Sequence, residues 1–136
     1  MIREIIRDEA FLSRKAEAAD KEDLSVGQDL LDTLLSHSDH CVGMAANMIG
    51  IPKAVIVFMN GDTPTVFYNP RILRASDPYE TQEGCLSLEG QRNITRFETI
   101  KVEYQNAKFQ KRVQTFTGYT AEIIQHEIDH LNGIII

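Results

Sequence analysis

Two histidines near the C-terminal end of the chain, His126 and His130, are spaced so that one helix could present both to a single metal ion. Residues four apart lie one above the other on a helix, and paired imidazoles at this spacing bind divalent metals. Glu127 lies about 100° around the helix from His126, so its carboxylate would border the ion without binding it. Because a divalent ion lowers the pKa of its bound water toward about 7, the spacing predicts a metal-dependent hydrolase. The alternative is a pair of exposed histidines on a charged helix.

A third ligand is needed, because catalytic sites of this kind have three protein ligands and one open position. Only residues 131–136 follow the pair, and none of them has a good metal-binding side chain. The third ligand is therefore expected upstream, where Cys85, Cys41, His40, His37 and many carboxylates are candidates. Spacing alone does not choose among them, and a single cysteine is often only a small buried hydrophobe. A separate site made of His37, His40 and Cys41 is a second interpretation.

The C-terminal segment that carries the histidines has a helical pattern. Ile124, Ile128 and Leu131 recur at positions i, i+4 and i+7 after Gly118, which predicts a helix with one apolar face. The histidines occupy another part of the same helix, so its apolar face is available for packing.

The N-terminal part of the chain predicts one further long helix. Residues 1–23 are highly charged and are expected to form an arm with a short helix. Residues 25–28 have the capping-box pattern, and leucines at helical spacing follow, so a helix is expected over residues 26–36. Residues 40–50 are punctuated by glycines and are interpreted as a loop.

The middle of the chain has the composition of β-strands. Asn60, Gly61 and Asp62 form a hairpin signal between two β-rich runs, and Pro70 is expected to end the second run, which Ile72 and Leu73 would resume. Strands joined by hairpins between two helices indicate an α+β fold rather than alternating α/β units. The expected strands are residues 54–59, 65–68, 99–104 and 111–117.

Composition limits the class of protein. The chain has 136 residues, 43% hydrophobic and 25% charged, which fits one domain over residues 1–136. A net charge of −6 argues against nucleic-acid binding, which usually needs a basic surface. No apolar run approaches the roughly 20 residues that span a membrane, and no export signal is evident. A cytoplasmic protein with two reduced cysteines is expected.

Three segments together resemble the peptide deformylase family. Residues 125–133 contain its complete Gln-His-Glu-x-Asp-His-Leu-x-Gly motif, and residues 83–87 contain Glu-Gly-Cys-Leu-Ser. Residues 41–48, Cys-Val-Gly-Met-Ala-Ala-Asn-Met, are an imperfect copy of Gly-x-Gly-x-Ala-Ala-x-Gln. The resemblance implies antiparallel β-sheets packed around the motif-bearing C-terminal helix. It also implies removal of the N-formyl group from the initiator methionine of nascent polypeptides, with an N-formylmethionyl peptide as substrate, including chains still at the ribosome.

The resemblance also implies roles for individual residues. Family members commonly use Fe²⁺, and Zn²⁺, Ni²⁺ or Co²⁺ can occupy the same site. Arg96 would pair with Glu83, and Gln125 and Asp129 would orient the metal-bearing helix. The resemblance assigns the metal to Cys85, His126 and His130, the acid/base role to Glu127, an oxyanion-stabilising N–H to Leu86, and substrate contacts to Gly43, Met48 and Arg92.

Two positions depart from the family motif. Met48 replaces a glutamine whose amide donates a hydrogen bond to the developing oxyanion, and a thioether has no N–H to donate. Loss of one such donor costs about 10²–10³ in turnover. Cys41 replaces a glycine. An alternative function is therefore a deformylase-like paralogue that binds metal and peptide with weak or no turnover. An endoprotease is disfavoured because a downstream ligand is missing.

Overall fold

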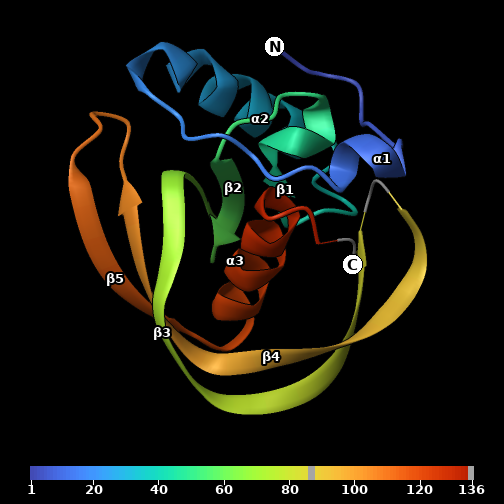
Figure 1. Cartoon of the computed structure of the whole chain (residues 1–136), viewed down its shortest axis with the longest axis vertical. Coiled ribbons are helices and arrows are strands. Elements are labelled where there is room, and N and C mark those ends of the chain that lie inside the picture. Colours follow the sequence, from blue (N-terminus) through green and yellow to red (C-terminus); the bar gives the residue numbers. More distant parts are fainter. Residues whose placement is uncertain (86–87, 135–136) are drawn as a thin grey trace.

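The computed structural model describes residues 1–85 and 88–134 and has an α+β architecture (Figure 1). One antiparallel sheet of five strands follows the chain order β1-β2-β3-β4-β5. This confirms the predicted fold class. The strands are β1 (Gly43–Ala45), β2 (Val55–Asn60), β3 (Thr63–Cys85), β4 (Leu88–Gln105) and β5 (Lys111–Thr117), and the α-helices are α1 (Glu9–Leu12), α2 (Leu24–Ser36) and α3 (Gly118–Leu131).

The helix α3 lies within the curve of the sheet, where the long strands β3 and β4 bend around its lower end in Figure 1. Its apolar face enters the core, since Ile124 is fully buried and Ile128 and Leu131 are nearly so. The aromatic side chains of Phe58 and Phe116 pack edge to face in the same core, with ring centroids 5.9 Å apart. Burial of this face orients the helix, so its histidines point toward a defined part of the sheet.

The first long helix begins earlier than its sequence pattern predicts. The helix α2 starts at Leu24, and its N-terminal neighbour Asp23 makes no side-chain cap. The predicted capping box at residues 25–28 is therefore wrong. Capping belongs instead to the preceding 3₁₀ turn η1 (Lys21–Asp23), where Asp20 and Asp23 bond each other's backbone N–H groups. The short helix expected in the N-terminal arm is present as α1.

The predicted hairpin at Gly61 is confirmed, because β2 and β3 pair from Asn60 and Thr63 outward. The prediction that Pro70 ends the strand is wrong. The sheet accommodates Pro70, which has no N–H to donate, at a register shift between Tyr68 and Arg71. Asn69, with φ of 52°, forms part of this irregularity. The strand then continues to Cys85, so the Cys85 thiol lies at the end of β3 that is farther from the β2–β3 turn.

Part of the segment interpreted as a loop is regular structure. Gly43, Met44 and Ala45 form the edge strand β1, and the 3₁₀ turn η2 (Ala46–Ile49) follows it. All three strand residues are buried, so they show none of the alternation between apolar and polar residues that reveals a half-exposed strand. Pairing of Gly43 with Phe58 places this short strand beside α3.

The N-terminal arm is anchored across the C-terminal end of α3. The Ala16 N–H donates to the Leu131 carbonyl at 2.7 Å, and Leu12 is fully buried. Gly133 has φ of 77°, and a Cβ atom there would lie 2.2 Å from the Ser13 carbonyl oxygen. The close approach of two backbone segments therefore requires glycine at this position.

Replacing Gly133 by alanine is expected to lower the free energy of unfolding by about 2–4 kcal/mol, since left-handed strain and overlap with backbone atoms each cost about 1–3 kcal/mol. Gly118→Ala is the matched control, because Gly118 also has positive φ (63°) but the nearest atom to its Cβ lies 3.9 Å away. That variant should lose only about 1 kcal/mol. Denaturant unfolding measures both. Equal losses would contradict the close packing of the arm.

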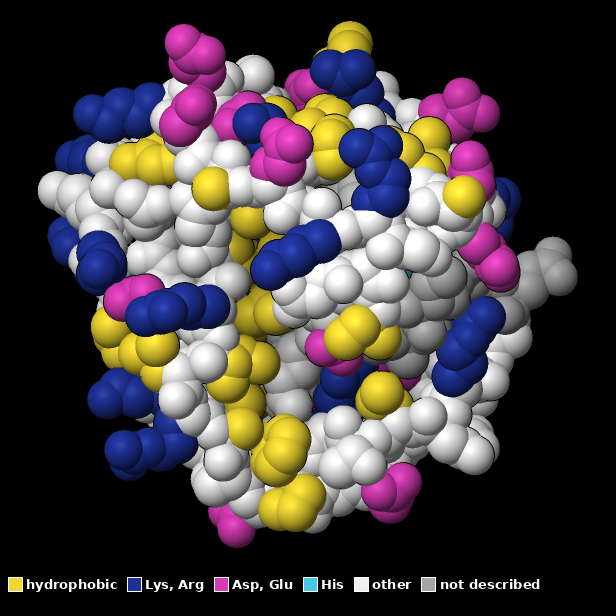
Figure 2. Space-filling view, in the orientation of Figure 1, with side chains coloured by type: hydrophobic (Ala, Val, Ile, Leu, Met, Phe, Trp, Pro, Cys, Tyr) yellow, Lys and Arg dark blue, Asp and Glu magenta, His cyan; other side chains and the backbone are white. Residues whose placement is uncertain are grey.

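The molecular surface mixes charges of both signs. Figure 2 shows Lys and Arg side chains interspersed with Asp and Glu, and a band of hydrophobic side chains through the middle of the view. Among the residues that the structure describes, no helix is both long enough and apolar enough to cross a membrane.

Candidate metal centre

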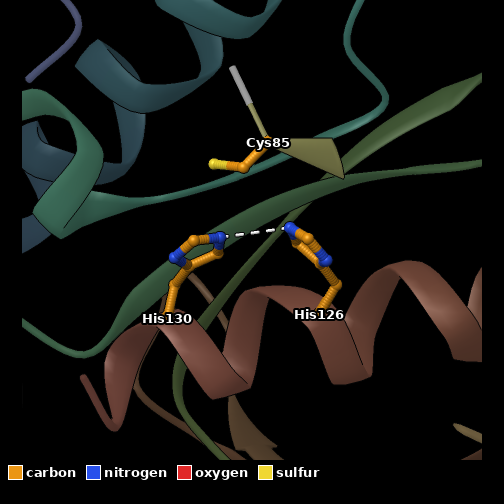
Figure 3. Close-up of side chains that lie close together, drawn as sticks. All are labelled: Cys85, His126 and His130. Carbon is orange, nitrogen blue, oxygen red and sulfur yellow. Dashed lines mark hydrogen bonds between the residues drawn. The ribbon is translucent and has the colours of Figure 1, made fainter. Parts of the chain in front are cut away.

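Cys85, His126 and His130 meet at one point in the folded chain (Figure 3). One ligand atom from each residue lies within 4.8 Å of the other two. The two histidines are one turn apart on α3, and their Nε2 atoms are 3.1 Å apart. Cys85 approaches from the end of β3. The structure therefore brings together the three residues that the family resemblance selects.

The other candidate ligands do not form such a group. Across residues 1–85 and 88–134, the Cys85 group is the only cluster of three or more His, Cys, Asp or Glu with this geometry. Cys41 instead directs its thiol to the Gly43 carbonyl at 2.9 Å. Burial raises the pKa of the Cys41 thiol to about 11, so this group stays protonated at neutral pH. The separate site with His37 and His40 is not formed.

Glu83 orients the first histidine of the pair. Its Oε1 atom lies 2.6 Å from His126 Nδ1, and its two oxygens accept bonds from Arg96 at 2.8 and 3.0 Å. Although burial opposes ionisation, hydrogen bonds from His126 and Arg96 hold the pKa of Glu83 at about 2. A bond from His126 Nδ1–H to this carboxylate leaves Nε2 directed at His130.

The expected helix-orienting residues are also engaged. Arg96 reaches Asp129 with its third nitrogen, Nη1, at 2.5 Å, which ties β4 to α3. The Gln125 side chain donates to the Phe97 carbonyl at 2.8 Å and accepts from the Phe97 N–H at 2.9 Å. Gln125 therefore pairs with the backbone of β4 as a neighbouring strand would. Together these bonds fix the rotation of α3 about its axis.

Glu127 lies beside the two histidines in a dry environment. Only 4% of its surface is exposed, and its Oε1 atom has no hydrogen-bond partner among the described residues. Burial raises the pKa of Glu127 to about 7. Its other oxygen approaches β1, where a Cβ atom on Gly43 would lie only 2.8 Å from Oε2. The carboxyl group therefore packs against the backbone of β1 at Gly43. A side chain at position 43 would displace it.

The two histidines differ in their electrostatic surroundings. Burial would lower the pKa of His126, but the charge of Glu127 and hydrogen bonds with Cys85 and Glu83 raise it to about 10. Burial and the nearby charge of His126 lower the pKa of His130 to about 3. His130 Nδ1 has no partner among the described residues. The negative groups around His126 would equally favour a bound cation.

A cavity of about 420 Å³ opens beside this cluster. One part of its wall is apolar and comes from residues 41–43, η2 and α3, while the other part is polar and comes from β3 and α3. Tyr119, which is 64% exposed, lies at its rim. The lining includes Cys41, Val42, Gly43, Met48 and Ile123 on the apolar part, and Gln82, Glu83, Glu122, His126 and Glu127 on the polar part.

The predicted substrate-binding residues fall in different places. Gly43 and Met48 line the cavity, whereas Arg92 does not, although its Nη1 atom is buried without a partner among the described residues. The predicted oxyanion donor Leu86 lies outside the described residues. Sequence reasoning missed Glu122 and Tyr119, which precede His126 by four and seven residues. That helical spacing would have placed both on the face of α3 that bears His126.

Comparison with known proteins agrees with the fold and the predicted function. A family model for polypeptide deformylase matches residues 2–136. The chain is 52% identical to a peptide deformylase of Clostridium beijerinckii over 136 residues, which is the full length of both proteins. The crystal structure of a peptide deformylase from Thermotoga maritima superposes with a TM-score of 0.89 at 31% identity, covering 99% of this chain and 95% of that one.

A second solved structure, a class I type b peptide deformylase from Acinetobacter baumannii bound to Met-Ala-Ser, has a TM-score of 0.89 at 29% identity, and 99% and 97% of the two chains are covered. The predicted enzyme class is therefore confirmed: the protein is a hydrolase that acts on N-formylated peptides, and a paralogue without useful turnover is not favoured. On this sequence and structural evidence, the chain belongs to the peptide deformylase family.

Proposed function

We propose that Cys85, His126 and His130 bind one divalent metal ion, Fe²⁺ in the cell, and that this centre removes the formyl group from the N-terminal methionine of nascent chains. The observation that carries the proposal is the convergence of the three ligand atoms within 4.8 Å. A thiolate with two imidazoles also accepts Zn²⁺, Ni²⁺ or Co²⁺, so the donor set fits any of these ions.

The residues fit a cation for a second reason. Both histidines are almost fully buried, and their Nε2 atoms face each other at 3.1 Å. Glu83 accepts from the other nitrogen of His126, so Nε2 is the nitrogen that faces His130, and a bound cation would replace its proton. Carboxylate–histidine pairs of this kind orient metal ligands and raise their basicity. A cation would also balance the charge of Glu83 and Glu127.

The chemistry divides between the ion and the chain. When bound, a divalent ion would polarise the formyl carbonyl and make a water molecule more acidic. Glu127 takes the proton from the attacking water and delivers it to the leaving amine, and a pKa near 7 suits both transfers. Gly43 lets Glu127 and Ile123 pack directly against β1, since a Cβ atom there would lie 2.8 Å from Glu127 Oε2 and 2.6 Å from Ile123 Cγ2.

The cavity supports the choice of substrate. Its apolar wall, formed by Val42, Met48 and Ile123, suits an unbranched methionine side chain, and its volume of about 420 Å³ would hold this residue and its formyl group. The rim near Tyr119 is open, so the rest of a peptide can extend into solvent. An N-formylmethionyl peptide, free or on the ribosome, is therefore the proposed partner.

Anaerobic metal titration tests the proposal. Metal-free protein receives increasing amounts of Fe²⁺ or Ni²⁺, and release of the free α-amino group of Met-Ala-Ser is measured with formyl-Met-Ala-Ser and, as control, acetyl-Met-Ala-Ser. Activity on the formyl peptide should rise in proportion to bound metal and stop rising at one equivalent. The acetyl peptide should react far more slowly. Activity that is independent of metal content, or saturation at two equivalents, would contradict the single three-ligand centre.

A further inference from the structure

We propose that Glu122 is a positioning residue of the metal centre, which holds Glu83 by a hydrogen bond and thereby maintains the orientation of His126. This inference rests on the metal centre proposed above. Glu122 lies one turn before His126 on α3, lines the same cavity, and is only partly exposed. It is not among the residues that the family motifs single out.

The hydrogen bonds form a continuous chain to the ligand. The Tyr79 hydroxyl group donates to Glu122 Oε1 at 3.4 Å, and the Glu122 carboxyl group bonds to Glu83. Glu83 in turn lies 2.6 Å from His126 Nδ1. Each link joins β3 to α3, so the chain crosses the junction between sheet and helix next to the metal ligands.

Glu83 has room for one more donor. Its Oε1 atom accepts from His126 and from Arg96 Nη2, and its Oε2 atom accepts from Arg96 Nε. A carboxylate has about four lone-pair sites, so these three bonds leave one. The bond with Glu122 fills it. Because Glu83 is buried, an unfilled site would cost free energy and leave the carboxylate less firmly held.

Two carboxyl groups can share a hydrogen bond only when one of them carries the proton. Arg96 and His126 stabilise the ionised form of Glu83, so its negative charge disfavours ionisation of Glu122. Burial and the bond to Glu83 raise the pKa of Glu122 to about 7, against the opposing influence of Tyr79 and Arg96. Of the two carboxyl groups, Glu122 is therefore the one that holds the shared proton more readily, and in that form it donates to Glu83.

The property to test is therefore the hydrogen-bond donor that Glu122 supplies to Glu83. Glutamine keeps an N–H donor at the same position, whereas leucine keeps the approximate volume and removes the donor. Changes in the partners of metal-binding histidines typically cost 10–100-fold in metal affinity. Since Glu122 acts through Glu83, Glu122→Leu is expected to release metal about tenfold faster. Glu122→Gln should stay within about twofold of the wild type.

The experiment uses the Co²⁺-loaded full-length protein. Transfer of Co²⁺ to an excess chelator is followed by visible absorption, and the absorption spectrum before transfer reports the ligand geometry. Glu98→Leu is the matched control, because Glu98 is an exposed carboxylate next to the start of α3 and does not line the cavity. Thermal unfolding of each metal-free variant separates metal release from loss of folding.

The outcomes distinguish the two proposals. Faster release and an altered spectrum for Glu122→Leu, with glutamine and the Glu98 control like the wild type, support the role of Glu122. If leucine releases Co²⁺ as slowly as the wild type, or if glutamine fails as badly as leucine, the positioning role is overturned. If the wild type binds no stoichiometric Co²⁺, the metal centre itself is wrong.

Discussion

Replacing Glu127 by glutamine is expected to lower kcat/KM for formyl-Met-Ala-Ser by about 10²–10⁴-fold, the usual contribution of a general acid–base group. The substitution preserves size and removes the ability to accept and return a proton. Glu127 is suited to this role because it is buried beside the two histidines, with one oxygen unpartnered among the described residues and a pKa raised to about 7. Initial rates of formate release measure the loss.

Two controls separate proton transfer from indirect effects. Metal content should stay at one equivalent in Glu127→Gln, because Glu127 is not among the three converging ligands. Glu80→Gln, a change to an exposed carboxylate on β3, should leave the rate unchanged. A fully metallated Glu127→Gln enzyme with a rate within tenfold of the wild type would show that another group transfers the proton.

Replacing Met48 by glutamine is expected to raise kcat, by as much as the 10²–10³-fold that one oxyanion donor contributes. Met48 lines the cavity and is 2% exposed, and its sulfur accepts a weak bond from the Ala45 N–H at 3.4 Å. A glutamine of similar length would accept this bond with its oxygen and direct its NH₂ group toward the reacting carbonyl. Turnover of formyl-Met-Ala-Ser at saturating substrate measures the gain.

Met48→Leu is the matched control, since leucine fills a similar volume but offers no donor. It should show no gain. A rate for Met48→Gln no higher than that of Met48→Leu would mean that the oxyanion is already fully stabilised by the ion and by backbone donors. The enzyme would then have no deficit at this position, in spite of the departure from the family motif.

Much of the secondary structure could be predicted because its determinants are local. The strand β5 was expected over residues 111–117 and is found there. The hairpin turn predicted at Gly61 joins β2 to β3. The long strands β3 and β4 were underestimated. Most residues of β3 beyond Pro70 are exposed, so no buried face imposes a period of two on that part of the sequence. Pairing between the two strands maintains them instead.

The sequence alone determined the half of the site that lies on one helix. His126, Glu127 and His130 have fixed relative positions because the rise and rotation per residue of a helix are constant. Glu122 and Tyr119 follow from the same periodicity. The choice of Cys85 over Cys41 had no such basis apart from the family resemblance, because 40 residues of chain separate Cys85 from His126.

Only the tertiary structure decided how the sheet completes the site. A register shift at Pro70 carries β3 to its end beside α3, where Cys85 faces the histidines and Glu83 reaches both His126 and Glu122. Contacts between distant segments depend on the summed register of a whole strand and on the packing of α3 in the core. The local periodicity of the sequence predicts neither the register of a strand nor the packing of α3. It does fix the relative positions of two histidines on one helix, because these depend only on helix geometry.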